Sequence, residues 1–535
     1  MNFFLIRNIR LPYTADDNEF TEKAKARLLH VGASLKGATF AIYKKSLDAR
    51  DRSDICFNAS VLAQGDFGRI SEKKLASANI AETADPYADI AFREGSETSE
   101  GRPLVVGMGP CGLFAAYLLA KQGYRPILID RGGSVSERVA AVDRFYTHGI
   151  LDTETNIQFG AGGAGTFSDG KLVTRIKDPA CAYVLKTFVA HGAGDSVLTS
   201  AKPHIGTDVL RGVVDSMLSE IERLGGELRY HCKLLSVEER ANACVARTTM
   251  GDILASCVVL AIGHSARDTY DYLMKGGFSI LPKSFSVGVR VEHLQSDVDR
   301  SLYGALAGDP RLPKGEYALS DTSGERGVYT FCMCPGGEVV AATSEEGSVV
   351  VNGMSRAARD GRNANSAMLV SVTPEDFSND VTRAIEFQRM MERAAFKLGG
   401  SDYSAPVLTV GDLLERKCSA EPKRILPSYM GGKTRLAPIY KEMPDFLYKG
   451  LLYGISKFER KLSCFSDRDA VLSGFETRTS APLRIQRNEQ LLAHGKSRIY
   501  PCGEGAGYAG GITSAACDGI RAAGAIISRF APAKE

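Results

Sequence analysis

The sequence has no long hydrophobic run and no strong excess of charge. A membrane helix needs about 20 consecutive apolar residues, whereas the longest apolar run here, residues 253–262, has the length of a buried strand. The net charge is +3, from 66 Lys and Arg against 63 Asp and Glu. Such a balance gives no electrostatic argument for a nucleic-acid partner. We therefore expect neither membrane nor nucleic-acid binding. The apolar stretch at residues 3–6 is too short for a signal peptide, which predicts a cytoplasmic protein.

Motifs of several enzyme classes are missing as well. The sequence contains neither HExxH nor GxSxG, so metalloprotease and α/β-hydrolase chemistry have no support. Its 12 cysteines are scattered from Cys56 to Cys517 and form no CxxC pair. A zinc cage or a secreted disulfide framework would need such spacing. We expect no metal site, and most thiols should be buried and reduced.

The composition is that of an ordinary globular protein. Hydrophobic residues make up 44% and charged residues 24% of the chain, which excludes a disordered protein. The 55 glycines follow no collagen-like period. The 535 residues correspond to three or four domains at ~150 residues each.

Changes of pattern divide the chain into segments. Residues 1–82 alternate strand-like and helical stretches, which predicts a small α+β domain, and the polar residues 83–101 indicate a linker. Residues 102–285 alternate buried strands with helices, as an α/β domain does. Residues 286–464 mix long strands with two helices. Residues 465–535 end in a Gly-rich turn and a helix.

The strongest motif is a dinucleotide-binding fingerprint, Gly107-Met-Gly109-Pro-Cys-Gly112. A predicted strand precedes it, an apolar helix follows, and Asp130 closes the next strand about 20 residues on, as in the Rossmann unit. We expect Gly107 to make the tight turn, Gly109 to let the backbone approach a pyrophosphate, and Gly112 to allow close helix packing. Asp130 would accept hydrogen bonds from ribose hydroxyls. A glycine turn without a ligand is the alternative.

A second Gly-rich motif near the C-terminus distinguishes FAD from NAD. Residues 500–513 read YPCGEGAGYAGGIT, a strand that ends in Gly503-Glu504 and is followed by glycines that open a helix. The motif resembles the second FAD motif of the glutathione-reductase-type flavoproteins, with Glu504 in place of the usual Asp. A helix N-terminus near Gly511 would stabilise negative charge on the reduced flavin. The cofactor predicted is FAD.

Other segments are expected to contact the same cofactor. The run 160–165 is rich in glycine, which permits close backbone approach. Residues 227–234 and 260–264 resemble strand ends that lie near the adenine half of FAD. The full set of expected FAD contacts is Gly107, Gly109, Pro110, Cys111, Gly112, Asp130, Arg131, Gly162, Gly163, Gly165, Thr166, Leu234, Ala261, Gly263, Gly503, Glu504, Gly511 and Ile512.

Longer strings carry a narrower resemblance. They are residues 155–172 (TNIQFGAGGAGTFSDGKL), 286–293 (SVGVRVEH), 331–337 (FCMCPGG), 351–355 (VNGMS), 363–366 (NANS) and 476–480 (ETRTS). Together they resemble a largely uncharacterised bacterial family of FAD-dependent dehydrogenase-like proteins. The resemblance spans nearly the whole chain. It implies an N-terminal ferredoxin-like domain followed by a two-domain flavoprotein, FAD binding and oxidoreductase activity, but no substrate.

Some residues suggest chemistry without establishing it. Cys332 and Cys334 flank Met333 in a predicted strand, so alternation would place both thiols on one face. They are either a reactive pair or structural. Ser168, Asp169 and Lys171 could contact the flavin or form a structural turn. His204, His264 and His293 are candidate proton donors, and Arg290 and Arg478 are candidate clamps for a carboxylate substrate; each also has a structural alternative.

These observations predict an α/β protein with a discontinuous Rossmann-like FAD domain of glutathione-reductase type. Residues 102–285 and 465–535 would form it, with an inserted mixed β/α substrate domain and the N-terminal α+β domain. The predicted function is hydride transfer between a small molecule and flavin N5. With only one dinucleotide fingerprint, any NAD(P)H would visit the flavin transiently. Two alternatives remain open: a flavin-fold binding protein with structural FAD and a partner-recruiting N-terminal domain, or a tRNA-modifying flavoenzyme. The balanced charge disfavours the latter.

Overall fold

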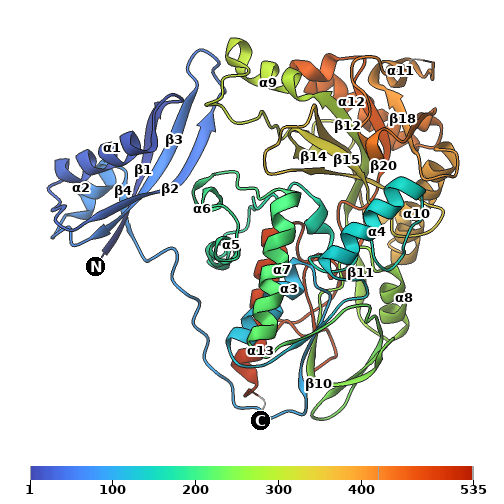
Figure 1. Cartoon of the computed structure of the whole chain (residues 1–535), viewed down its shortest axis with the longest axis horizontal. Coiled ribbons are helices and arrows are strands. Elements are labelled where there is room, and N and C mark those ends of the chain that lie inside the picture. The colour runs from blue at the N-terminus through green and yellow to red at the C-terminus, as the bar shows by residue number, and fades with distance from the viewer. Residues whose placement is uncertain (1, 420, 533–535) are drawn as a thin grey trace.

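The N-terminal part of the protein forms a small antiparallel sheet. The computed structural model describes residues 2–419 and 421–532 (Figure 1). The first elements are β1 (Asn2–Pro12), α1 (Asp17–His30), β2 (Thr39–Asp48), β3 (Cys56–Gly65), α2 (Glu72–Ser77) and β4 (Ile80–Thr83). The strand order is β2-β3-β1-β4, and all neighbours are antiparallel. α1 starts at a capping box, in which Asp16 accepts from the N–H of Glu19 and Glu19 accepts from the N–H of Asp16.

The segment predicted as a linker, residues 83–101, docks in part against the last helix, α13 (Ile512–Arg529). Glu97 accepts hydrogen bonds from Arg529 at 2.6 Å and from Arg498 at 2.9 Å. The side chain of Arg498 is buried. Earlier in the segment, Lys186 of α5 (Ala180–Ala190) donates to the carbonyl of Tyr87 at 3.0 Å, and Phe92 packs against the hydrophobic core. The segment seen as a long connection in Figure 1 is therefore in contact with the body of the protein over much of its length.

A second, larger sheet carries the parallel strands. Its elements are β5 (Arg102–Val106), β6 (Ile127–Ile129), β7 (Glu227–Arg229), β8 (Leu234–Glu239), β9 (Cys244–Thr248), β10 (Gly251–Leu260) and β22 (Ile499–Pro501). The order is β7-β6-β5-β10-β9-β8, with β22 beside β10. β7, β6, β5, β10 and β22 are parallel, whereas β8, β9 and β10 form an antiparallel meander. The single strand expected from residue 227 is split, because the chain turns at His231 with a φ of +54°.

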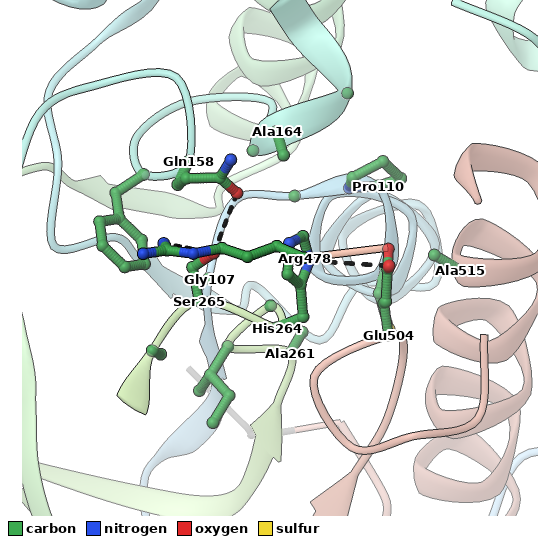
Figure 2. Close-up of a pocket in the computed structure, with 18 of the residues that line it drawn as sticks. Gly107, Pro110, Gln158, Ala164, Ala261, His264, Ser265, Arg478, Glu504 and Ala515 are labelled. Carbon is green, nitrogen blue, oxygen red and sulfur yellow. Dashed lines mark hydrogen bonds and ion pairs between the residues drawn. The ribbon is translucent and has the colours of Figure 1, made fainter. Parts of the chain in front are cut away.

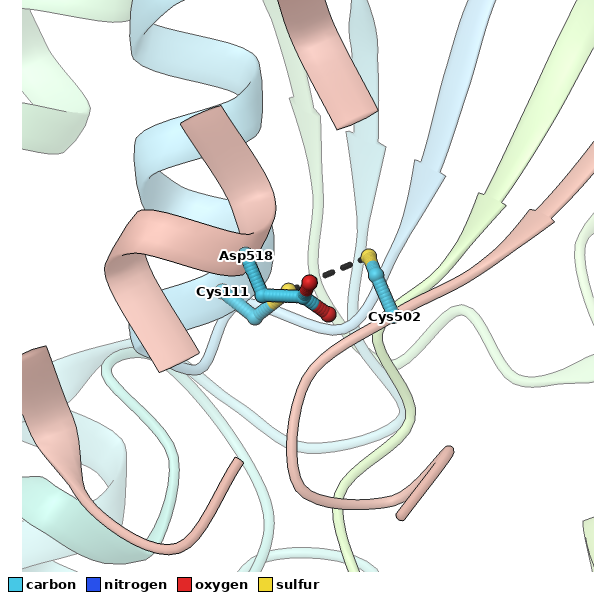
Figure 3. A group of neighbouring side chains, drawn as sticks. All are labelled: Cys111, Cys502 and Asp518. Carbon is cyan, nitrogen blue, oxygen red and sulfur yellow. Dashed lines mark hydrogen bonds between the residues drawn. The ribbon is translucent and has the colours of Figure 1, made fainter. Parts of the chain in front are cut away.

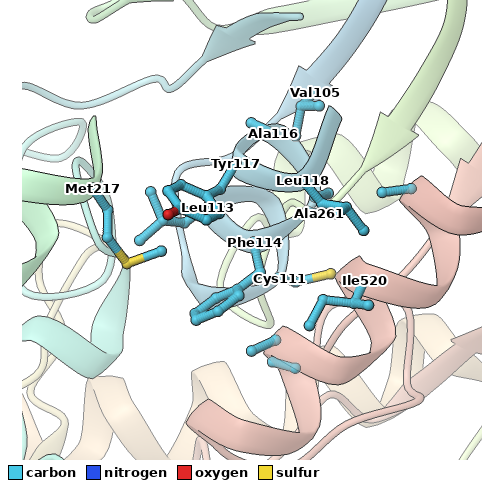
Figure 4. Close-up of a cluster of buried hydrophobic side chains, with 14 of the residues drawn as sticks. Val105, Cys111, Leu113, Phe114, Ala116, Tyr117, Leu118, Met217, Ala261 and Ile520 are labelled. Carbon is cyan, nitrogen blue, oxygen red and sulfur yellow. The ribbon is translucent and has the colours of Figure 1, made fainter. Parts of the chain in front are cut away.

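Helices pack in a layer beside this sheet. They are α3 (Pro110–Lys121), α5 (Ala180–Ala190), α7 (Thr207–Arg223) and α13. Ten of the twelve residues of α3 are buried. A helix that is buried on all of its faces must be surrounded by other elements. Figure 4 shows Phe114 of α3 between Met217 of α7 and Ile520 of α13. α13 comes very close, because a Cβ at Gly519 would lie 2.0 Å from the carbonyl oxygen of Cys111.

The middle of the chain builds a third, mostly antiparallel sheet. Its order is β13-β14-β17-β12-β20-β18-β19. The elements are β12 (Phe285–Leu294), α9 (Gln295–Tyr303), β13 (Ser320–Asp321), β14 (Val328–Cys334), β17 (Asn363–Val372), α10 (Val381–Leu398), β18 (Ala405–Thr409), α11 (Val410–Glu415), β19 (Thr434–Leu436), α12 (Asp445–Phe458) and β20 (Val471–Glu476). The boundary predicted after residue 464 is corrected here: β20 lies inside this sheet, between β12 and β18, so the unit extends to Glu476.

Short elements complete the described part. They are α4 (Val135–His148), α6 (Ser196–Thr199), α8 (Arg267–Lys275), β11 (Ile280–Pro282), β15 (Gly337–Ala341), β16 (Val351–Ser355), β21 (Leu483–Ile485) and the 3-10 turns η1 (Ala164–Phe167), η2 (Gly304–Leu306), η3 (Pro374–Phe377), η4 (Tyr429–Gly431), η5 (Ile439–Lys441) and η6 (Ser463–Ser466). β15 pairs with β16, and β11 pairs with β21. Among the described residues, no helix combines the length and apolar character needed to cross a membrane.

Candidate functional site

A large cavity lies between the parallel sheet and the middle sheet. The space within it is about 1510 Å³, including the part that opens to solvent. One wall comes from the carboxyl ends of β5, β6 and β10 and from the N-termini of α3 and α13; the other comes from β14, β16 and β20. In open α/β sheets, ligands bind at the carboxyl ends of the strands where the strand order reverses. β5 and β10 provide such a point here.

The fingerprint glycines divide into packing positions and an open one. A Cβ at Gly107, where φ is +105°, would lie 2.3 Å from the carbonyl oxygen of Ala261, and a Cβ at Gly112 would collide with Gly107. Gly112 does not line the cavity. Gly109, the N-cap of α3, has open space in front of it: the nearest described atom to a Cβ there is the Cα of Gly163, 3.8 Å away.

The Asp130 carboxylate accepts hydrogen bonds from three backbone N–H groups. Its Oδ2 accepts from the N–H of Met108 at 2.8 Å, and its Oδ1 accepts from the N–H groups of Gly132 and Gly160, both at 2.9 Å. The carboxylate thus ties the fingerprint turn to the second Gly-rich loop. It still lines the cavity, so a ribose contact would be added to these bonds.

Arg131 is fixed by its neighbours at the same end. Its guanidinium hydrogen-bonds Glu154 at 2.9 Å and Asp268 at 2.8 Å, and it lies over the ring of Phe159 at 4.3 Å. Lys233 completes this charged rim, with its ammonium 3.1 Å from Glu154. Neither Phe159 nor Lys233 was among the predicted contacts.

The glycine loop 160–165 is shaped by a buried arginine. Arg138 of α4 is fully buried and donates to the carbonyl groups of Asn156, Ile157, Ala161 and Gly163. These four bonds hold the loop to α4, and Gly163 and Gly165 line the cavity. Gly162 and Thr166, which were also predicted contacts, lie behind this surface.

The C-terminal motif brings a carboxyl group and an imidazole together. Glu504 Oε1 lies 3.6 Å from His264 Nδ1, and Figure 2 shows the two side chains facing each other below Pro110 and the end of α3. Burial raises the pKa of Glu504 to about 7. Burial, with the charges of Arg478 and Arg267, lowers the pKa of His264 to about 3. His264 is therefore neutral near pH 7, and its Nε2 has no hydrogen-bond partner among the described residues.

α13 begins directly at the cavity. Gly511 is its N-cap, and a Cβ there would meet no described atom within 4 Å. Gly511, Ile512 and Ala515 all line the cavity. Gly503, also predicted as a contact, packs instead against Cys111, whose Cβ would lie 2.8 Å from a Cβ at that position.

Arg478 lines the cavity but is already paired with a buried carboxylate. Its Nη2 hydrogen-bonds Glu392 Oε2 at 2.8 Å, and Arg267 grips the same buried carboxylate at 2.8 Å. Thr477 donates to it as well. Burial by itself would raise the pKa of Glu392, but the two arginines hold it well below the usual range. The charge of Arg478 is thus balanced by Glu392 inside the protein.

Arg290 is likewise paired with a buried carboxylate. It is fully buried and donates to Glu476 at 2.8 Å, to Asn365 at 2.8 Å and to the carbonyl of Cys332 at 2.6 Å. Glu476 lines the cavity from the middle sheet. Each arginine therefore already holds an internal carboxylate. Arg290 does not line the cavity, whereas Arg478 does, so a substrate contact by Arg478 stays a prediction.

Cys332 and Cys334 do not share a strand face. β14 has an irregularity between Phe331 and Cys334, and Cys332 takes a left-handed conformation with a φ of +46°. Cys332 lines the cavity, whereas Cys334 is fully buried and receives a hydrogen bond from Arg290 at 3.4 Å. Simple alternation failed because of the bulge.

The polar residues after the glycine loop are engaged in ion pairs. Asp169 accepts from Arg359 at 2.6 Å, Lys171 lies 3.5 Å from Glu316, and the hydroxyl of Ser168 donates to the loop backbone. Ser168, Asp169 and Lys171 all line the cavity.

Of the predicted contacts, the structure brings fourteen to one surface. They are Gly107, Gly109, Pro110, Cys111, Asp130, Arg131, Gly163, Gly165, Leu234, Ala261, Gly263, Glu504, Gly511 and Ile512. Residues not predicted as contacts also line it, among them Gln158, Phe159, Lys233, Ser265, Phe331, Asn352, Glu476 and Thr479. Most of these fall in the strings at 155–172, 331–337, 351–355 and 476–480, which was the available signal. Of the other two histidines proposed as proton donors, neither His204 nor His293 lines the cavity.

Comparison with known proteins identifies the family. Residues 284–479 match the family described as "FAD-dependent protein, C-terminal domain-like". An uncharacterized protein of Clostridium beijerinckii is 43% identical over 534 residues, covering 98% of both chains. The chain belongs to this family of FAD-dependent proteins. FAD is its cofactor.

Solved structures offer only distant likenesses. CtdE in complex with FAD is 13% identical, covers 81% of this chain and 84% of its own, and has a TM-score of 0.32. The halogenase PltM with phloroglucinol and FAD is 11% identical, covers 80% and 71%, and has a TM-score of 0.37. Scores this low define neither fold nor reaction for the present chain.

The cavity fits FAD on its own geometry. Three glycines, Gly109, Gly263 and Gly511, present backbone where a Cβ would find no close described neighbour. Two helix N-termini, of α3 and α13, supply N–H groups without intrahelical partners, which suit phosphate and a reduced flavin. His264, whose Nε2 has no hydrogen-bond partner among the described residues, lines the same cavity. The residues present therefore suit a long, phosphate-bearing, partly apolar ligand such as FAD.

Proposed function

We propose that the protein is an FAD-dependent oxidoreductase, a dehydrogenase or reductase, that moves a hydride between a small molecule and flavin N5. One observation carries the proposal: the glycine cradle and the polar end of the middle sheet line the same cavity. A protein that kept FAD only as a structural element would not need a polar wall from a second sheet on that cavity. Bound FAD supplies the hydride-accepting ring.

The residues of this chain have separable tasks in that reaction. The N-terminus of α3 and Gly109 would hold the pyrophosphate, and Asp130 and Leu234 would lie at the ribose and adenine end. The N-terminus of α13, at Gly511, would face the flavin ring and favour its reduced, negatively charged form. These assignments follow from which strand end carries each residue.

The middle sheet would supply the substrate side of the site. Phe331, Asn352 and Thr479 line the cavity opposite the glycine loops. Phe331 is 38% exposed, so an apolar surface faces the open part of the cavity. Closing that part with a bound substrate would exclude water from the transferred hydride. Glu504, with its pKa near 7, could hold or release a proton close to the flavin end.

The finer architecture is also part of the proposal. The β-α-β-β-α-β order and the strand order of the N-terminal sheet support a ferredoxin-like domain at residues 1–82. The parallel sheet and α13 support a glutathione-reductase-type FAD domain built from two stretches of chain. We propose that NAD(P)H, where used, binds only transiently and that the protein acts in the cytoplasm without nucleic acid.

Anaerobic reduction tests the proposed function. The protein is purified with FAD, desalted, and mixed without oxygen first with NADPH or NADH and then with candidate oxidised substrates. Bleaching of the flavin by a reductant, followed by recovery of colour with a small-molecule acceptor, is the expected result. A protein that retains FAD but exchanges electrons with none of these reagents would instead support the alternative, a binding protein with structural FAD.

A further inference from the structure

Two cysteines far apart in the sequence meet at the edge of the helix layer. Cys181 lies in the first turn of α5, and Cys517 lies in α13; their Sγ atoms are 3.7 Å apart. α5 and α13 pack directly against each other. A disulfide needs its sulfurs to approach to about 2 Å, so the two sulfur atoms would have to come closer by about 1.7 Å. Neither thiol has a role in the cavity described above.

The two thiols differ in exposure and charge. Cys517 is fully buried, whereas Cys181 is partly exposed. The hydrogen bond from the Cys517 thiol lowers the pKa of Cys181 to about 7 and raises that of Cys517. Arg521 pairs with Asp178 just ahead of α5; the charge of Arg521 favours the Cys181 thiolate, whereas that of Asp178 opposes it. A partly exposed thiol with a lowered pKa beside a second thiol is the arrangement of redox-responsive cysteines.

We propose that Cys181 and Cys517 form a reversible disulfide when the protein meets hydrogen peroxide. The Cys181 thiolate attacks one peroxide oxygen, the O–O bond breaks, and a sulfenic acid and one water form after proton uptake. The Cys517 thiol then displaces the hydroxyl from the Cys181 sulfur, which makes the S–S bond and releases a second water. Two thiol hydrogens and two electrons pass to the peroxide in total. A dithiol reverses the reaction by exchange.

The bridge would act on a segment that reaches the cavity. Residues 172–179 connect Leu172 to α5, and Leu172 accepts a hydrogen bond from Thr513 of α13 at 2.7 Å. Lys171, just before it, lines the cavity. A covalent link between α5 and α13 would therefore fix the connection between this loop and the helix that begins at Gly511.

The chain contains a matched comparison pair. Cys111 and Cys502 lie even closer, with their sulfurs 3.1 Å apart, and Figure 3 shows them beside Asp518. Both are buried, and burial raises the pKa of Cys111 well above its usual value. Asp518 is held by Arg487 at 2.7 Å. If distance alone decided reactivity, this pair would oxidise first; if exposure and thiolate character decide, the Cys181 pair reacts first.

Peptide mapping of the FAD-loaded protein tests the proposal. The full chain is treated with stoichiometric hydrogen peroxide, free thiols are alkylated over time, and each cysteine is quantified by mass spectrometry. We expect the Cys181–Cys517 disulfide to form at least about tenfold faster than any bond to Cys111, and dithiothreitol to restore both thiols. Persistence of free Cys181 after peroxide, or earlier loss of Cys111 and Cys502, would overturn the proposal.

Variants separate the two steps. In Cys517→Ala, oxidation should stop at a Cys181 sulfenic acid, which dimedone traps, whereas Cys181→Ala should give neither product. Cys418→Ala, which removes another partly exposed thiol, should behave as the parent. Dimedone labelling of Cys418 rather than Cys181 would contradict the assignment. The mapping of the parent protein decides the matter even where a variant folds poorly.

Discussion

Two buried glutamates near the cavity respond to burial in opposite ways. Burial raises the pKa of Glu504 to about 7, because the positive charge of Lys283 offsets only part of the effect of burial. Glu392 is as deeply buried, but two arginines contact it and keep it ionised. The identity of the residue thus says little about its charge; its partners decide. At this scale Glu504 is suited to exchange a proton and Glu392 to hold structure.

Gly109→Val tests the phosphate cradle. A valine fits the backbone, where φ is −69°, but its side chain would enter the open space before Gly163. We expect FAD to bind about 10- to 100-fold more weakly, the equivalent of about 1–3 kcal/mol of overpacking, with folding largely intact. Titration of the FAD-free protein with FAD measures the change. Gly212→Val, on an exposed turn of α7, is the control; full affinity in Gly109→Val would refute the cradle.

His293 should make the protein sensitive to mild acid. It is fully buried with both ring nitrogens unpartnered among the described residues, and burial lowers its pKa to about 4. The unfolded chain therefore binds a proton near pH 6.5 that the folded chain refuses, so stability is full above that pH and falls below it. Between about pH 7.5 and about pH 5.5 His293 should account for a loss of about 1.3 kcal/mol.

Urea unfolding at the two pH values checks this contribution. In His293→Leu the drop in unfolding free energy should shrink by that amount, whereas replacing His148, which is exposed at the end of α4, by Gln should leave the drop unchanged. An identical pH dependence in the parent and His293→Leu would show that the imidazole is protonated in the folded state.

At the scale of elements, helix α10 connects the sheets through one residue. Glu392 projects from it to Arg267 of α8 and to Arg478, which follows β20. These segments come from different parts of the chain, so the carboxylate joins the parallel-sheet unit to the middle sheet. Glu392 is fully buried, which makes an unpaired charge there costly.

Glu392→Gln should therefore destabilise the protein strongly. The substitution keeps the shape but leaves the buried guanidinium of Arg478 without a carboxylate and that of Arg267 with Glu345 alone, at a cost of about 3–5 kcal/mol. Glu386→Gln, on the same helix, removes an ion pair to Arg393 whose partners are 53% and 55% exposed, and should cost less than about 1 kcal/mol. The free energies of unfolding in urea compare the two, and equal losses would contradict the bridging role of Glu392.

Local sequence patterns predicted the helices and strands better than they predicted which strands and side chains pair with one another. The fingerprint, with its strand, turn and acidic residue, could be read from the sequence because all its parts lie within about 25 residues. The pairing of β20 with β12 could not, because nearly 180 residues separate them and their burial pattern gives no register. Alternation also misplaced Cys332, since a bulge changes the side on which the thiol lies. The ion pairs of Arg290 with Glu476 and of Arg478 with Glu392 also join residues far apart in the sequence.

At the scale of the whole molecule, the cavity exists because two independently built sheets face each other. The parallel sheet brings glycine loops to its carboxyl edge, and the middle sheet covers them with Asn352, Glu476 and Thr479. Sequence position separates these residues by up to about 370 positions, yet they line one space. The fold thus places a cofactor cradle and a second polar wall together, which a nucleotide-binding module by itself would not need.

The central claim is that this cavity holds one FAD that exchanges electrons with a small molecule. The most direct measurement is the visible spectrum of the FAD-loaded, desalted protein during anaerobic addition of NADPH or NADH and then of acceptors. The account predicts one tightly bound FAD per chain, loss of its colour on reduction and recovery with an acceptor. A colourless protein that takes up no added FAD would contradict it.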